Sequence, residues 1–340
     1  MGIILKSIST IAANYLGKDK PLIWDHKITT RCNCQCVFCN IWKMNHNEEL
    51  STEGVKKLAD QVYDLGCTIA SFSGGEPLLR PDIKEILQHC KKRMRTNLIT
   101  NGLLLKSKIK EIAPYCDNIT ISLDAPDETH DKLRGTNGVF KIATEGIKIA
   151  SKYVPVSVNC VITEENLDKV CDMPEFIKQL GARSISFEPV VSLGDFSETA
   201  YDIKKNKKYL QVIDRLIKMK KAGAPIGNSM EYFKLVSGKR TWKCIGHRVY
   251  IRTNPKGGLV LPCGSWGGDY GFTDIDSKKD GAKAAWNSKK AVGLRRIADK
   301  CPYLDKCTFP CVVEPSLIYY GSVSSLLAYA KQARQIISKK

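Results

Sequence analysis

The chain has 340 residues, of which 43% are hydrophobic and 26% charged, and a formal net charge of +18 from 53 Lys+Arg against 35 Asp+Glu. Such a composition is typical of a globular, soluble protein. No apolar run reaches the 18 residues that a membrane-spanning helix needs, and the N-terminus lacks the features of a secretory signal, so we expect a cytoplasmic protein.

The first segment, residues 1–20, carries Ile4, Ile8, Ile11 and Tyr15 at helical spacing, which predicts an N-terminal amphipathic helix. From 21 to 222, short runs rich in Ile, Val, Thr and Phe alternate with longer amphipathic stretches. The expected strands are Leu22–Thr29, Thr68–Ser73, Arg95–Thr100, Asn118–Leu123, Val156–Ile162 and Ser184–Val190. The expected helices include Thr52–Leu65, Asp82–Lys92, Val139–Tyr153, Leu167–Leu180 and Lys205–Lys221.

Strand–helix units in series favour parallel strands with right-handed crossovers, so the predicted fold class is α/β, with a partial (β/α)6 barrel. Chemistry in such barrels gathers at the carboxyl ends of the strands. Gly66 and Gly181 follow two of the helices, where a left-handed cap favours glycine.

Beyond the barrel, residues 223–315 are rich in Gly, Pro and Cys and predict a small loop-rich domain, with a hairpin turn at Asn254–Gly258. Residues 316–340 predict a basic C-terminal helix with an apolar face. Its apolar positions are Leu326, Ala330, Ala333 and Ile337. Packing on the barrel is the favoured interpretation of both terminal helices, and peripheral contact with an anionic inner membrane surface is the alternative.

Three cysteines, Cys32, Cys36 and Cys39, directly follow the first expected strand. Without a secretory signal, metal binding explains clustered cysteines better than disulfides do. Three thiolates hold three irons of a [4Fe–4S] cluster and leave the fourth iron open for a substrate or cofactor. Cys34 lies too close to its neighbours to reach the far corner of such a cluster, and a zinc site built from the four cysteines is the alternative.

The segment Cys32–Cys39, with Phe38 at its aromatic position, matches the CxxxCxΦC signature and therefore resembles the radical S-adenosylmethionine (AdoMet) superfamily. This resemblance implies that AdoMet chelates the open iron. An electron from the reduced cluster then cleaves AdoMet to a 5′-deoxyadenosyl radical, which abstracts hydrogen from an unactivated C–H bond. It also implies a reductant such as ferredoxin or flavodoxin.

Motifs at later strand ends carry the resemblance further. The expected contacts of the AdoMet amino group come from Gly74, Gly75, Glu76 and Pro77, which form a GGEP segment after the second strand. Segments similar to the family's TNG, SLD and HDxxRG motifs add Asn101, Ser122, Asp124 and Arg134 as cofactor-binding residues. Asn159 and Glu188, on the fifth and sixth strands, are expected to face the same cavity.

A second group of cysteines lies in residues 223–315: Cys244, Cys263, Cys301, Cys307 and Cys311. Their CX13GX4C and CX5CX3C spacings resemble the SPASM or Twitch appendage, which implies auxiliary iron–sulfur clusters. Ala298 stands where the full motif has another cysteine, so we expect one auxiliary [4Fe–4S] cluster held by four of the five, or by three with substrate on the last iron. Structural zinc is the alternative.

The substrate stays open at this stage. The net charge favours an anionic small molecule or a lipid slightly over a peptide, and no nucleic-acid-binding module is evident. The alternatives are a maturase that modifies a peptide or protein and a non-enzymatic iron–sulfur protein that transfers electrons.

Overall fold

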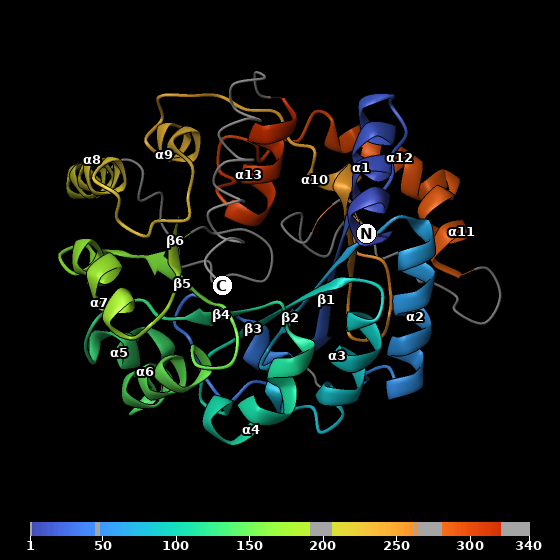
Figure 1. Ribbon diagram of the computed structural model, residues 1–340. Helices are drawn as coiled ribbons and strands as arrows, with labels where there is room; N and C mark the ends of the chain where they lie inside the picture. Colours follow the sequence, from blue (N-terminus) through green and yellow to red (C-terminus); the bar gives the residue numbers. More distant parts are fainter. Residues whose placement is uncertain (1, 45–47, 191–205, 262, 264–280, 321–340) are drawn as a thin grey trace.

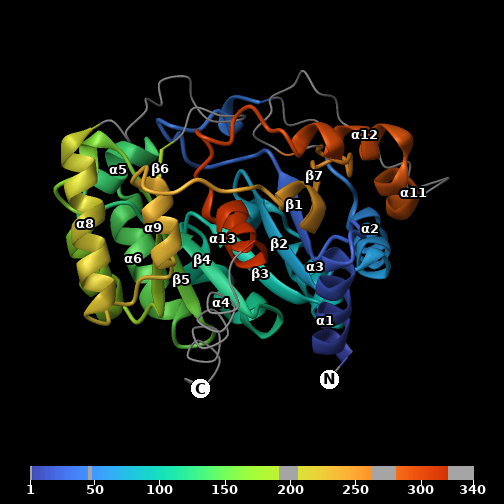
Figure 2. The ribbon, with the colours of Figure 1, turned by 90° about the horizontal axis from the view of Figure 1, so that it is seen from above.

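A computed structural model describes residues 2–44, 48–190, 206–261, 263 and 281–320. Seven parallel strands form one sheet in the order β6-β5-β4-β3-β2-β1-β7, and helices cover its outer face (Figures 1 and 2). This arrangement confirms the predicted open α/β barrel, in which the first six strands follow chain order. The four apolar positions named above for the C-terminal helix lie outside the described residues.

The first six strands lie close to their predicted positions. They are β1 (Ile23–Thr29), β2 (Ile69–Gly74), β3 (Arg95–Thr100), β4 (Asn118–Ser122), β5 (Val156–Ile162) and β6 (Ser184–Pro189). The crossover helices are α2 (Thr52–Leu65), α3 (Ile83–Lys91), α4 (Leu105–Ile112), α5 (Thr129–Arg134), α6 (Val139–Ala150) and α7 (Met173–Gln179). After β6 come α8 (Lys207–Lys221) and α9 (Met230–Val236).

The cysteine-rich region joins the barrel instead of standing apart from it. Its strand β7 (Tyr250–Thr253) follows α10 (Gly246–Val249) and pairs in parallel with β1. Asn254–Gly258 then turns the chain back, as predicted, with the amide of Asn254 donating to the Gly258 carbonyl at 2.9 Å. The remaining helices are α11 (Gly281–Asn287), α12 (Lys289–Ala298) and α13 (Pro310–Tyr319).

Alternation along the strands separates an apolar outer face from a polar inner face. On β2, Ala70 and Phe72 are buried against the helices, whereas Ser71 points to the opposite side of the sheet. There, Asn97 Nδ2 donates to Ser71 Oγ at 3.2 Å, and Asn118 Nδ2 donates to Asn97 Oδ1 at 2.9 Å. The inner face of the barrel therefore offers hydrogen-bonding groups to a polar ligand.

The N-terminal helix α1 (Gly2–Tyr15) docks on the barrel through its polar side chains. Thr10 and Asn14 are buried, whereas the predicted apolar stripe that includes Ile4 and Ile8 faces outward. Docking of this helix on the barrel was the favoured prediction. The contacts come from its polar side chains and from Tyr15, whose ring stacks on that of Tyr319 with centroids 4.5 Å apart. Among the described residues, no helix is long and apolar enough to cross a bilayer.

Candidate functional site

The predicted cysteine triad lies on the loop that leaves the carboxyl end of β1. The three side chains pack in one cluster around Phe38. Burial raises the pKa of the Cys32 thiol to about 11, and the negative charges of Cys36, Glu76 and Cys39 add to this effect. The raised pKa favours the protonated thiol, whereas bound iron would favour the thiolate, because a metal cation binds the ionised form. Cys32 and Cys39 are partly exposed, and Cys36 is buried.

Cys34, which is left out of the predicted ligand set, is buried in the same cluster as Cys36. Its side chain is 1% exposed, and Asn101 Nδ2 lies 3.3 Å from its sulfur. Burial raises the pKa of this thiol to about 12. The exclusion of Cys34 from the ligand set stays a prediction.

Gly74 and Gly75 hold the end of β2 against the start of the cysteine loop. The amide of Gly75 donates to the Thr29 carbonyl, and that of Glu76 donates to the Arg31 carbonyl, both at 2.8 Å. A Cβ atom at Gly74 would lie 2.2 Å from the Thr29 oxygen, and one at Gly75 would lie 2.1 Å from the Arg31 oxygen. Only glycine allows two backbone segments to approach so closely.

The Glu76 carboxylate is occupied by bonds within the chain. It is fully buried and accepts hydrogen bonds from the amides of Leu78 and Asn101 at 3.0 and 2.8 Å and from Thr100 Oγ1 at 2.8 Å. Burial raises its pKa to about 7 despite these donors. Glu76 thus ties the ends of β2 and β3 together, and the backbone of the GGEP segment is the part left to meet a cofactor.

Asn101 also acts within the protein. Besides its contact with Cys34, its Nδ2 donates to Asn33 Oδ1 at 2.7 Å, and its Oδ1 accepts from the amide of Leu103 at 3.0 Å. The side chain predicted to contact AdoMet therefore positions the cysteine loop from the end of β3.

Asp124 and Arg134 form a buried pair behind the triad. Nε and Nη2 of Arg134 donate to the two carboxylate oxygens at 2.7 and 2.9 Å. The Asp124 pKa is held well below its usual range: burial acts to raise it, but the charges and hydrogen bonds of Arg134 and His130 together outweigh that effect. Arg134 Nη1 points to Cys36, at 3.8 Å from its sulfur, and the guanidinium lies 5.3 Å from the centre of the Phe38 ring.

The loop and α5 are joined by backbone contacts as well. The amides of Gln35 and Val37 donate to the carbonyls of Arg134 and Leu133 at 3.1 and 3.0 Å. A Cβ atom at Gly135 would lie 2.2 Å from the Gln35 oxygen. The HDxxRG segment therefore places Arg134 by clamping the cysteine loop, which leaves one face of that guanidinium towards the triad.

Ser122, Asn159 and Glu188 come from consecutive strands. Ser122 is paired in register with Asn159, and Asn159 Nδ2 donates to Glu188 Oε1 at 2.8 Å. Burial raises the pKa of Glu188. The structure thus brings these three predicted residues to one side of the barrel, on the inner face of β4, β5 and β6.

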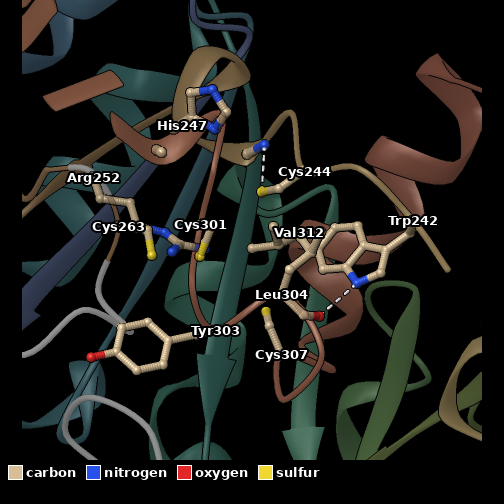
Figure 3. Close-up of a pocket in the computed structure, with 12 residues that line it drawn as sticks. Trp242, Cys244, His247, Arg252, Cys263, Cys301, Tyr303, Leu304, Cys307 and Val312 are labelled. Carbon is tan, nitrogen blue, oxygen red and sulfur yellow. Dashed lines mark hydrogen bonds between the residues drawn. The ribbon is translucent and has the colours of Figure 1, made fainter. Parts of the chain in front are cut away.

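Four of the five C-terminal cysteines line one cavity (Figure 3). They are Cys244, Cys263, Cys301 and Cys307. Cys244 Sγ accepts from the amide of Gly246 at 3.3 Å. The rest of the lining is mostly apolar, with two polar side chains, His247 and Arg252.

Cys311 does not line this cavity. It is exposed, and Arg252 Nη2 lies 3.8 Å from its sulfur. Arg252, on β7, also donates through Nε to Asp25 Oδ2 on β1 at 3.1 Å. Sequence analysis missed Asp25 and Arg252, because they lie in unremarkable segments and only the β1–β7 pairing brings them together.

Both cysteine groups fit clusters better than single metal ions. In the described part of the chain, no three His, Cys, Asp or Glu side chains are placed to hold one ion. A tetrahedral zinc site needs four ligands around one point, whereas a [4Fe–4S] cluster carries each thiolate on a different iron. Three neighbouring thiols on one loop and four around one apolar cavity suit the latter.

The fold and the triad together define the class: a parallel α/β barrel whose first strand leads into a cysteine loop. Residues 26–177 match the model of the radical SAM superfamily. This part of the chain is therefore a radical SAM domain.

Two curated relatives extend the similarity beyond the barrel. The antilisterial bacteriocin subtilosin biosynthesis protein AlbA of Bacillus subtilis is 28% identical over 84% of this chain and 66% of its own length. Fe-coproporphyrin III synthase of Methanosarcina barkeri is 29% identical over 89% of this chain and 86% of its own. Another relative, an AdoMet-dependent heme synthase from the same organism, is 34% identical but is matched over only 48% of each chain.

Among solved structures, Streptococcus suis SuiB bound to its precursor peptide SuiA has a TM-score of 0.69 and 17% identity, over 90% of this chain and 75% of that one. The structure of anSMEcpe with bound AdoMet and the Kp18Cys peptide has a TM-score of 0.67 and 17% identity, over 85% and 88%. These likenesses show the fold.

Proposed function

We propose that Cys32, Cys36 and Cys39 hold a [4Fe–4S] cluster whose fourth iron takes AdoMet. The observation that carries this proposal is the burial of Cys34, which is 1% exposed with Asn101 Nδ2 3.3 Å from its sulfur, whereas Cys32 and Cys39 are partly exposed. When bound, the cluster and AdoMet supply the reductive cleavage that starts hydrogen abstraction from an unactivated C–H bond.

The chain's own residues hold this site in place and keep water from it. The glycines at the end of β2 and the Asn101 side chain fix the loop from one side, and the Asp124–Arg134 pair fixes it from the other. Leu133, Val139, Val161 and Val190 pack around the loop and make its inner side apolar. Burial raises the pKa of the Cys36 thiol, and the Arg134 charge partly offsets this effect, because a cation nearby favours the ionised form of a thiol.

We infer that the second cavity holds one auxiliary [4Fe–4S] cluster on Cys244, Cys263, Cys301 and Cys307. Support comes from the shared lining and from the position of Cys311 outside it. Replacing Cys307 by Ala is expected to halve the iron content of anaerobically reconstituted protein, whereas Cys311→Ala is expected to keep it. Equal iron loss in the two variants would contradict this ligand set.

A peptide is the substrate class that the relatives support best. AlbA is named for bacteriocin biosynthesis, and both peptide-bound structures share the fold over most of this chain. The polar inner face of the barrel suits a peptide backbone, which carries one donor and one acceptor per residue. A tetrapyrrole is the second candidate, since the Fe-coproporphyrin III synthase is matched over most of both chains.

Anaerobic reconstitution followed by dithionite and AdoMet tests the reaction. Wild-type protein and Cys34→Ala are expected to release 5′-deoxyadenosine, and Cys36→Ala is expected to release none. Failure of fully iron-loaded wild-type protein to form this product would favour an electron carrier. Deuterium transfer into 5′-deoxyadenosine from labelled peptide, tetrapyrrole or lipid would then identify the substrate class.

A further inference from the structure

Helix α1 is held to the barrel by polar contacts. Ser7 Oγ lies 2.7 Å from Thr68 Oγ1, and Thr10 Oγ1 donates to the Gly66 carbonyl at 3.1 Å. At the end of the helix, Tyr319 Oη donates to the Asn14 carbonyl at 2.6 Å, and the half-exposed Tyr15 ring stacks on Tyr319. A surface helix normally turns its apolar stripe to the core. In α1 the polar stripe contacts the barrel instead.

The opposite face of α1 and the residue that follows it carry large apolar side chains into the solvent. They are Ile4 (58% exposed), Leu5 (60%), Ile8 (58%), Ile11 (42%), Tyr15 (49%) and Leu16 (77%). These six make up half of the twelve large apolar side chains that are exposed among the described residues. Apolar side chains gathered on one exposed face mark an interaction site.

Basic side chains border this apolar face. Lys18 and Lys20 are exposed just past its end. At its edge, Lys6 Nζ and the Arg93 guanidinium lie 3.6 and 5.5 Å from the centre of the Tyr63 ring. Nearby carboxylates partly offset these charges: Asp64 acts on Lys6, Asp60 pairs with Arg93 at 3.4 Å, and Asp19 pairs with Arg295 at 3.2 Å. The chain as a whole still carries +18.

We propose that the outward face of α1 docks on an anionic lipid bilayer. An apolar helix face enters the boundary between head groups and acyl chains, and basic residues beside it are attracted to anionic lipids. Lys18 and Lys20, exposed at the end of this face, favour an anionic bilayer over a second copy, which would present the same two positive charges. This inference is independent of the proposed reaction.

Docking through α1 places the bilayer away from the candidate site. The helix is bonded to Gly66 and Thr68, which precede β2, whereas the glycines that hold the cysteine loop lie at the other end of that strand. Helix α1 lies at the outside of the molecule in both views, far from α6 (Figures 1 and 2).

Vesicle flotation of the full chain tests the proposal. We expect binding to vesicles of phosphatidylcholine with phosphatidylglycerol, weaker binding to phosphatidylcholine alone, and loss of affinity as salt is raised. The triple variant Ile4→Asn, Leu5→Asn, Ile8→Asn should bind at least about tenfold more weakly, because it removes the apolar anchor. Neutralising Lys18 and Lys20 with Gln should cost about fivefold for each charge on anionic vesicles only.

Matched variants on α6 serve as controls. Ile142 is 39% exposed there, and Lys141 and Lys148 are exposed beside it. Ile142→Asn and the two Lys→Gln changes should leave vesicle binding unchanged. Circular dichroism would confirm that every variant is folded. Absence of wild-type binding to anionic vesicles overturns the proposal. It is also overturned if the wild type is a dimer, and the triple substitution makes it monomeric without changing vesicle binding.

Discussion

Replacing Gly75 by Ala should detach the cysteine loop from β2. The added Cβ would lie 2.1 Å from the Arg31 carbonyl oxygen, 2.6 Å from its carbon and 2.8 Å from the Thr30 oxygen. All three are backbone atoms, so no side chain can rotate away, and the loop must retreat by roughly 1 Å to reach ordinary contact. That movement stretches the hydrogen bonds at 2.8 Å from the amides of Gly75 and Glu76.

The cost combines two effects. Overpacking of a well-packed site costs about 1–3 kcal/mol, and weakening buried hydrogen bonds adds about 1 kcal/mol. A loss of about 3 kcal/mol lowers the melting temperature by about 4 °C in a chain of 340 residues, since the entropy of unfolding is about 2 cal/mol/K per residue. Because the displaced segment carries the triad, we also expect the variant to lose the N-terminal cluster and keep the auxiliary one.

The assay is iron and sulfide content after anaerobic reconstitution, together with thermal unfolding followed by circular dichroism. Gly293→Ala on α12 is the matched control, because a Cβ at that position meets nothing within 4 Å. Wild-type iron content and melting temperature in Gly75→Ala would refute the claim that the close approach of these two backbones positions the triad.

Two further changes test the neighbouring contacts. Asp124→Asn leaves Arg134 buried without its counter-charge, and we expect a loss of about 3–5 kcal/mol in the free energy of unfolding near neutral pH. The pKa of Asp124 is lower in the folded state than its usual value of 3.8. Its contribution to the free energy of unfolding is therefore fully present above pH 3.8 and is lost as the pH falls through the folded-state pKa. The free energies of unfolding of the wild type and the variant, measured by denaturant titration, should converge in acid. Cys34→Ala should retain the iron content and 5′-deoxyadenosine formation of the wild type. A lower iron content in Cys34→Ala than in the wild type would show that Cys34 is a ligand.

Much of the barrel was predictable from the sequence, because the spacing of apolar residues and the length of each segment distinguish its strands from its helices. Arg95–Thr100, Val156–Ile162 and Thr52–Leu65 are found at the predicted bounds, since buried strands and an amphipathic helix each leave a clear pattern. Strand β7 was not predictable. Its four residues form a strand only because β1 offers a free edge, and that pairing depends on contacts distant in sequence.

The site divides in a similar way. Cysteine spacing predicted the triad and the region of the second group, because the chemistry of thiolates requires those residues. Spacing did not reveal that Cys311 stands apart beside Arg252. The binding of a cofactor by Glu76, Asn101 and Asp124 stays a prediction. The structure shows in addition that their side chains hold loops together within the protein, a role that a sequence motif does not reveal.

The pairing of β7 with β1 bears on how this protein can be divided for experiments. A fragment that stops before Tyr250 keeps every strand of the predicted barrel but exposes the backbone of β1 along the register from Ile23 to His26. An uncovered inner strand of this kind is a template for aggregation. Excising the cysteine-rich part as an independent module would therefore damage the half that carries the triad, and studies of either cluster call for the undivided polypeptide.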